Sequence, residues 1–260
     1  MERRNTLVAL IVVVLALASG FLVGCGSDPT PANPTLTVVA KTLGAVLGLY
    51  WDDVPDADEY RVYIDNALWN TFTTSAADID SASRGSLVEV SASGKGGESG
   101  RAQKNLTLAE TTNLIVWSAQ DPDTTHPSFV RFNADGTAAA VTCSQSNTAH
   151  FFVDGTAGNL QFRSIQNATV CGVNANVDPF FNDTGTTNYS GSTLAPGPGV
   201  YNDPQNLVDQ GVYYIWVDLA PFGTWGTNDF YAKLKVNAVA GLQTTLQIGY
   251  QKEGGLRWLK

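Results

Sequence analysis

The apolar residues of this chain recur at every second position in many short segments, and this period of two is its most constraining feature. Leu47, Leu49 and Trp51, for example, alternate with two residues that would face the other way. Because successive side chains of a β-strand point to opposite faces, such alternation predicts strands with one buried face. Residues 242–251 alternate in the same way, and no segment of the second half has a convincing helical period. The sequence therefore predicts an all-β protein.

Turn-forming residues break these segments into short strands and divide the chain into two β-rich modules. Asp65 with Asn66, and the Asp-Gly pair at 135–136, each separate two strand-like runs, as hairpin turns do. With 260 residues, of which only 15% are charged, the chain is long enough for two ordinary domains. We expect a first sandwich at 36–108 and, at 109–260, a second antiparallel β-sandwich or jelly-roll-like fold.

The N-terminus has the composition of an export signal. Arg3 and Arg4 precede an apolar stretch from Leu7 to Val23, which is followed by Gly24 and Cys25. The sequence Leu-Val-Gly-Cys at 22–25 resembles the lipobox of bacterial lipoproteins. That resemblance implies a signal peptide at 1–24, cleavage after Gly24 and diacylglycerol on the Cys25 thiol. An uncleaved signal anchor is the alternative, because the apolar stretch is at the lower length limit for crossing a bilayer.

The segment at 25–35 contains small residues and three prolines, so we expect an extended tether. Lipid on Cys25 would hold the protein to a membrane of the bacterial cell envelope, since two or more acyl chains give stable attachment. In Gram-negative lipoproteins, Asp after the lipidated cysteine retains the protein at the inner membrane. Gly26 at this position therefore implies the outer membrane if the source is Gram-negative.

The other two cysteines fit an oxidising compartment. Cys143 and Cys171 are separated by 28 positions (171 − 143 = 28), and we expect them to form a disulfide. Closing such a loop would stabilise the fold by about 3–4 kcal/mol in the chain-entropy estimate. Two buried free thiols are the alternative.

The first module carries a family resemblance. The segments at 47–51, 54–57 and 60–63 resemble the B and C strands of fibronectin type III domains, and 88–92 with 96–99 resembles their F strand and F–G turn. The resemblance implies a sandwich with Trp51, Tyr60 and Val88 in its core, although the family usually has Tyr where this chain has Val88. Since the chain lacks an Arg-Gly-Asp tripeptide, we expect a spacer between the membrane and the second module.

The segment from Asn174 to Gln210 is rich in Asn, Asp, Gly, Pro and Thr, and we expect a long loop there. Aromatic side chains on loops can form binding surfaces for sugars, peptides or flat ligands. The candidate ligand-binding residues are therefore Phe180, Phe181, Tyr189 and Tyr201. The alternative is that these aromatics fold back and cover the edge of the sandwich.

Two further resemblances concern the second module. Residues 211–217 with 231–236 resemble the closing strands of bacterial pre-peptidase C-terminal domains, and 231–234 with 248–250 resembles the end of HmuY-type haem-binding lipoproteins. A haem site would need axial ligands, and the only histidines are His126 and His150.

A calcium site is a separate alternative for the second module. Carboxylate oxygens are typical Ca²⁺ ligands, and the candidate residues for such a site are Asp121, Asp123 and Asp135. The chain has no complete EF-hand pattern. Neither a metal nor haem is therefore part of the principal expectation.

The sequence contains no Gly-x-Ser-x-Gly, no His-Glu-x-x-His and no phosphate-binding loop. We therefore expect no enzyme, with a carboxylate-based hydrolase left as the alternative. The net charge of −9 argues against nucleic acid as a partner. The principal expectation is a non-catalytic lipoprotein whose C-terminal module binds an envelope, extracellular protein or glycan partner. The alternatives are a haem or metal carrier and a polysaccharide-binding accessory protein.

Overall fold

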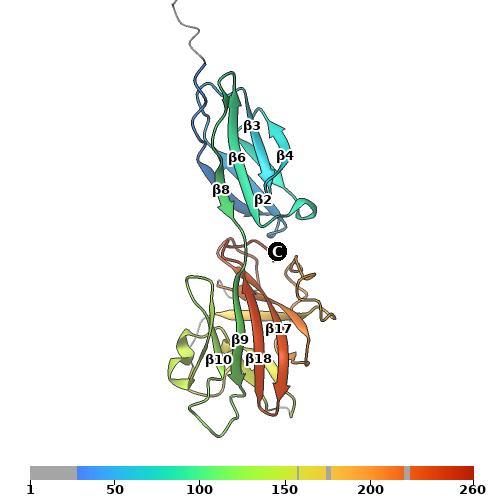
Figure 1. The fold of residues 1–260 in the computed structure, drawn as a ribbon. Coiled ribbons are helices and arrows are strands. Elements are labelled where there is room, and N and C mark those ends of the chain that lie inside the picture. Colours follow the sequence, from blue (N-terminus) through green and yellow to red (C-terminus); the bar gives the residue numbers. More distant parts are fainter. Residues whose placement is uncertain (1–27, 157, 174–176, 220–222) are drawn as a thin grey trace, which may run out of the picture.

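The computed structural model describes residues 28–156, 158–173, 177–219 and 223–260. It shows two antiparallel β-sandwich modules that lie end to end, which confirms the predicted fold class (Figure 1). The signal segment and Cys25 lie outside the described residues. Among the residues that are described, no helix is long and apolar enough to cross a membrane.

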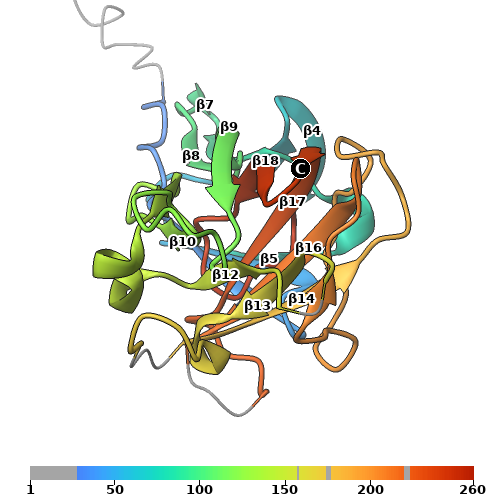
Figure 2. The same ribbon diagram turned by 90° about the horizontal axis from the view of Figure 1, so that it is seen from below.

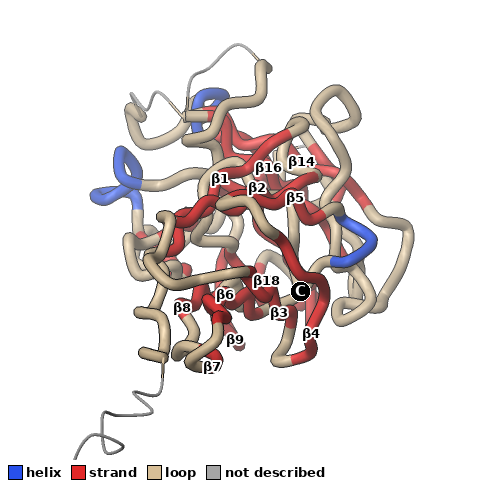
Figure 3. The backbone as a smooth tube through the Cα atoms, turned by 90° about the horizontal axis from the view of Figure 1, so that it is seen from above, coloured by secondary structure: helices blue, strands red, loops and turns tan. Residues whose placement is uncertain are grey.

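Two antiparallel sheets form the first module, and Figure 3 views them from above. The smaller sheet has the order β1-β2-β5, from β1 (Leu36–Lys41), β2 (Val46–Trp51) and β5 (Ala76–Ile79). The larger sheet contains β3 (Glu59–Ile64), β4 (Ala67–Phe72), β6 (Leu87–Gly94), β7 (Gly97–Glu98) and β8 (Ala102–Asn105). A 3-10 helix, Ser81–Ser83, lies between β5 and β6.

The core of the first module follows the predicted alternation. Trp51, Tyr60 and Val88 are all buried, as the sequence predicts. The rings of Trp51 and Tyr60 lie 5.5 Å apart, and the Tyr60 hydroxyl accepts a hydrogen bond of 2.8 Å from the Val54 N–H. The predicted turn between β3 and β4 is also present, because Asp65 and the residue after it both have positive φ.

Residues 28–35, where we expect an extended tether, form no helix or strand but lie against the first module. Pro31 and Pro34 are buried there. The Thr30 hydroxyl donates a hydrogen bond of 2.9 Å to the Gly96 carbonyl oxygen. This part of the chain is therefore held by the first module.

The second module also consists of two antiparallel sheets of five strands each, and Figure 2 shows them from below. One sheet, in the order β14-β16-β17-β18-β9, contains β9 (Ala109–Trp117), β14 (Asp178–Asp183), β16 (Val212–Asp218), β17 (Phe230–Ala240) and β18 (Gln243–Tyr250). The other, in the order β11-β10-β12-β13-β15, contains β10 (Phe129–Phe132), β11 (Ala138–Val141), β12 (Phe151–Asp154), β13 (Gln161–Ser164) and β15 (Gln205–Asn206).

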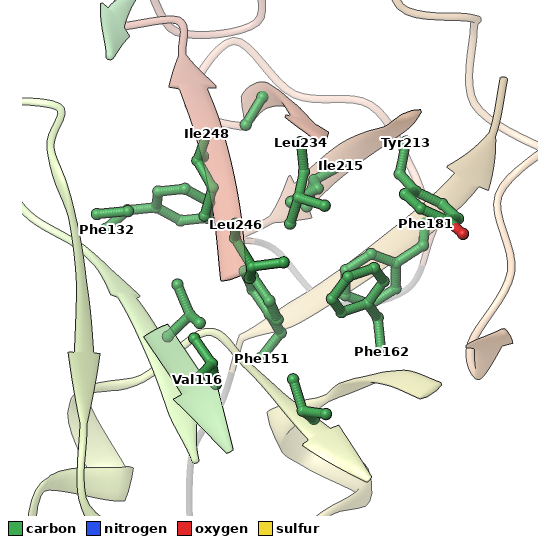
Figure 4. Packing of buried hydrophobic residues seen from close by; sticks show 14 of the residues in the cluster. Val116, Phe132, Phe151, Phe162, Phe181, Tyr213, Ile215, Leu234, Leu246 and Ile248 are labelled. Atoms are coloured by element: carbon green, nitrogen blue, oxygen red, sulfur yellow. The ribbon is translucent and has the colours of Figure 1, made fainter. Parts of the chain in front are cut away.

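The main core of the second module lies between its two sheets (Figure 4). Phe151 and Phe162 from one sheet meet Phe181 from the other, with ring centroids 5.5 Å apart in both pairs. Leu246 and Ile248 of β18 complete the contact and are buried. Burial of several large apolar side chains, each worth about 1.5–3 kcal/mol, is the main force that holds the two sheets together.

A disulfide lies on the outer side of the sheet that contains β10, β11, β12, β13 and β15. Cys143 and Cys171 are bonded, with their Cα atoms 5.4 Å apart, which confirms the predicted pair. Cys143 begins a 3-10 helix, Cys143–Thr148, and Cys171 follows a second one, Ile165–Asn167. The bond therefore joins the two segments that cover the outer face of this sheet.

The C-terminal segment returns to the first module after β18. Leu256 and Trp258 belong to the first module's core cluster. The Trp258 indole N–H donates to the Ala45 carbonyl oxygen at 3.1 Å, and the Arg257 N–H donates to the Gly44 carbonyl at 3.0 Å. A side chain on Gly44 would overlap the Gly255 carbonyl oxygen, 2.0 Å from its Cβ. The two modules thus share a packed junction.

Candidate functional site

The segment at 184–196, which we call the strap, crosses the outer face of the sheet that contains β14, β16, β17, β18 and β9. It leaves the end of β14, and the Tyr189 hydroxyl donates a hydrogen bond of 2.7 Å to Glu110 on β9 at the far edge of the sheet. The Lys233 ammonium lies 4.4 Å from the Tyr189 ring centroid and donates to the Tyr189 carbonyl oxygen at 3.3 Å. The strap is therefore fixed by side-chain contacts rather than by strand pairing at this point.

Gly249 of β18 makes room for this arrangement. A Cβ at Gly249 would lie 2.5 Å from the Tyr189 hydroxyl and 2.7 Å from a Glu110 carboxylate oxygen. Gly249 faces Glu110 on one side and Lys233 on the other in the strand register. Only a residue without a side chain allows Tyr189 to lie this close to the sheet.

An open groove with a volume of about 490 Å³ lies between the strap and the edge of this sheet. Five of the twelve residues that line it carry amide or aliphatic hydroxyl groups, namely Asn182, Thr184, Thr186, Asn188 and Ser192. Tyr214 of β16 and Arg257 of the C-terminal segment also line it. Its volume is in the range of small-ligand sites, and its polar lining suits a hydrogen-bonding ligand.

Tyr214 and Arg257 provide the two distinctive groups of the groove. Tyr214 is half-buried, and its hydroxyl makes no hydrogen bond with any described residue. The Arg257 guanidinium donates to the Ala195 carbonyl oxygen at 2.9 Å, whereas its Nε is buried without a partner. Within the described part of the chain, no carboxylate is close enough to form an ion pair with Arg257.

The segment at 174–210 differs from the expected uninterrupted loop, because β14 and β15 form within it. Phe181 of β14 points into the main core and is fully buried. Phe180 points to the opposite face, where its ring centroid lies 5.6 Å from that of Trp216. The local sequence did not predict β14 as a strand, because its aromatic residues are flanked by Asn and Asp, which are typical of turns.

The candidate aromatic residues therefore pack against the protein, and none of the four lines the groove. Tyr201 lies over Trp216 with ring centroids 5.8 Å apart, and its hydroxyl donates to the Pro196 carbonyl oxygen. Burial raises the pKa of the Tyr201 hydroxyl well above its usual value. Tyr189 holds the strap across the sheet. The groove is nevertheless lined mainly by other residues of the segment at 174–210, in which we predicted a binding surface.

The three candidate calcium ligands do not form one group. Asp121 and Asp123 flank His126, with carboxylate-to-nitrogen distances of 3.4 and 3.6 Å. Asp135 lies in the turn between β10 and β11 and accepts hydrogen bonds from Thr137. Among the described residues, no cluster of three or more His, Cys, Asp or Glu side chains could hold a metal ion.

The two histidines have different surroundings. His126 is stacked on Trp117, with ring centroids 3.9 Å apart. His150 lies at the start of β12, where its Nδ1 accepts a hydrogen bond of 3.2 Å from the Phe132 N–H. Burial lowers the pKa of His150 to about 4. Neither histidine lines the groove.

The groove contains no histidine or cysteine, and its single carboxylate, Asp183, accepts a hydrogen bond from the Gly185 N–H. The sequence matches no protein-family model and no curated protein. The features that bear on function are therefore the N-terminal motif, the fold and the groove.

Proposed function

We propose that this chain is a membrane-anchored bacterial lipoprotein of the cell envelope with a non-catalytic binding role. The lipobox-like sequence that ends at Cys25 supports the anchor. The bond between Cys143 and Cys171 is what an oxidising, extracytoplasmic compartment would allow. In a Gram-negative source, Gly26 favours the outer membrane.

The first module, in this proposal, is a fibronectin type III-like domain that connects the anchor to the binding module. Its sheet order β1-β2-β5 opposite β4-β3-β6, with β8 beside β6, supports this assignment. Trp51 and Tyr60 occupy the core as they would in that family. The docked residues at 28–35 would hold this module close to the membrane surface.

The second module presents the binding surface, and the observation that carries this proposal is the groove beside the strap. It is open, and it combines amide and hydroxyl groups with the half-buried ring of Tyr214 and the guanidinium of Arg257, which forms no ion pair with a described carboxylate. An unpaired arginine and an aromatic ring in a concave site are typical of ligand recognition.

The anchor is tested by the Cys25→Ala variant in a bacterial host that is labelled with radioactive palmitate. We expect the wild-type chain to be labelled and to fractionate with membranes, and the variant to lose both properties. Labelling and fractionation that do not change in the variant would show that the lipobox interpretation is wrong.

The groove is tested by binding of the soluble chain, without residues 1–25, to envelope preparations. We expect Tyr214→Leu to reduce binding, because it removes the aromatic surface of the groove. Tyr50→Leu is the matched control, since Tyr50 is 39% exposed on the first module. Thermal melting should show that both variants are folded, and equal binding by all three proteins would argue against the groove.

A further inference from the structure

The ligand class of the groove can be inferred from how its groups are arranged. The side chains of Asn182 on β14 and Tyr214 on β16 occupy paired positions in the register, so an amide lies beside an aromatic ring. The strap supplies further hydroxyl and amide groups to the lining, of which the Thr184 and Ser192 hydroxyls already donate to backbone carbonyl oxygens. A ligand that fits must therefore offer an apolar face together with many donors and acceptors.

Arg257 adds a requirement for negative charge. Three other arginines of the described chain, Arg61, Arg101 and Arg163, each form an ion pair with a carboxylate. Arg257 forms none, and neither do Arg84 and Arg131, which donate to uncharged oxygens. Of these three, only Arg257 lines the groove. In a chain with a net charge of −9, an anionic ligand needs such a local cation to overcome the general repulsion.

Gly197 lies next to the guanidinium. The nearest atom to a Cβ built on Gly197 would be a terminal nitrogen of Arg257, at 3.5 Å. The strap and the first module both hold Arg257: its guanidinium donates to the Ala195 carbonyl oxygen, and its backbone N–H donates to the Gly44 carbonyl oxygen. The guanidinium is therefore positioned before any ligand binds, which reduces the entropy cost of binding.

We propose that the groove binds a saccharide that carries a carboxylate, such as a uronic acid unit of an acidic glycan. This inference rests on the proposed role of the groove as the binding site. The C–H face of a sugar ring stacks on Tyr214, its hydroxyl groups exchange hydrogen bonds with the Asn, Thr and Ser side chains, and its carboxylate pairs with Arg257. A protein partner fits less well, because the large exposed apolar side chains lie outside the groove.

The test uses calorimetric titration of the soluble chain with oligogalacturonate, oligomannuronate and hyaluronan oligosaccharides. Each is compared with its carboxyl-reduced form, which keeps the sugar ring but has no charge. We expect at least one acidic oligosaccharide to bind about tenfold or more tightly than its reduced form, since a charged hydrogen-bonded pair is lost. This comparison uses the wild-type chain, so it does not depend on the folding of a variant.

Arg257→Gln should weaken binding of the acidic oligosaccharide about tenfold or more and leave binding of the reduced form unchanged. Arg131→Gln is the matched control, because Arg131 bonds to Asn133 and Thr148 and lies outside the groove. Equal binding of acidic and reduced forms, or no binding of any acidic oligosaccharide, would overturn the inference. If Tyr214→Leu still reduces binding to envelopes in that case, the groove remains the site and only the ligand class is wrong.

Discussion

The junction between the modules gives the most direct test of the architecture, through the variant Trp258→Ala. Trp258 is 1% exposed and lies in the core of the first module, although it belongs to the C-terminal segment. Truncating a buried Trp to Ala costs about 3–5 kcal/mol, from lost burial and the cavity that remains. The variant also removes the hydrogen bond from the indole N–H to the Ala45 carbonyl.

A loss of this size is large for the first module. Domains of 60–100 residues lose about 4–8 °C in Tm for each kcal/mol, so we expect its unfolding transition to fall by about 12 °C or more. Differential scanning calorimetry should then resolve two transitions where the wild-type chain shows one or a closely spaced pair. Loss of the shared packing is the physical reason, since the modules would no longer unfold together.

The matched control is Trp117→Ala, because Trp117 is half-exposed and contacts His126 within the second module. It should leave the unfolding of the first module unchanged. If Trp258→Ala also leaves that transition within about 2 °C of wild type, a burial cost of this size is excluded and the junction does not couple the modules.

Three further predictions concern the second module. Because the folded pKa of His150 is about 4 and the usual value is 6.5, unfolding takes up a proton between these pH values, and stability should fall by about 3 kcal/mol as pH drops from 6.5 to 4. His150→Gln should flatten the pH dependence of the urea midpoint; an unchanged slope would contradict the assignment. Reducing the disulfide, or replacing its cysteines beginning with Cys143→Ser, should lower the free energy of unfolding by about 3 kcal/mol, measured by urea denaturation. If the reductant leaves the stability of the wild-type chain unchanged, this would argue against the bond. Gly249→Ala should displace Tyr189 and abolish binding to envelopes, while Gly226→Ala, whose Cβ has no neighbour closer than 3.5 Å, should bind normally; equal binding by both would refute the role of the strap.

Local patterns in the sequence were sufficient to predict much of the fold. The alternation around Trp51 and Tyr60 identified strands and the residues that are buried in them. The turn at Asp65 was predicted because its residue types favour positive φ. The pairing of Cys143 with Cys171 followed from the compartment implied by the N-terminus. Each of these predictions depends on a short segment of sequence or, for the disulfide, on the number of cysteines.

Contacts between distant segments could not be predicted in this way. The hydrogen bond from Trp258 to Ala45 joins residues 213 positions apart, and no local period indicates it. The groove takes side chains from β14, the strap, β16 and the C-terminal segment, so its members share no motif. Sequence analysis selected aromatic residues in the right region, but the tertiary packing determined that they face the core and the sheet. Arg257 was missed because an isolated arginine has no signature until its surroundings are known.

The junction and the groove are parts of one structure, because the strap is paired with the C-terminal segment. The Ala195 N–H donates to the Arg257 carbonyl at 3.0 Å, and Leu194 forms a bridge with Trp258. Arg84 of the first module donates to the Thr193 hydroxyl at 3.1 Å. The first module thus holds the C-terminal segment, and this segment in turn holds one wall of the groove. The first module therefore contributes to the rigidity of the groove, which would lower the entropy cost of binding for the ligand that we propose.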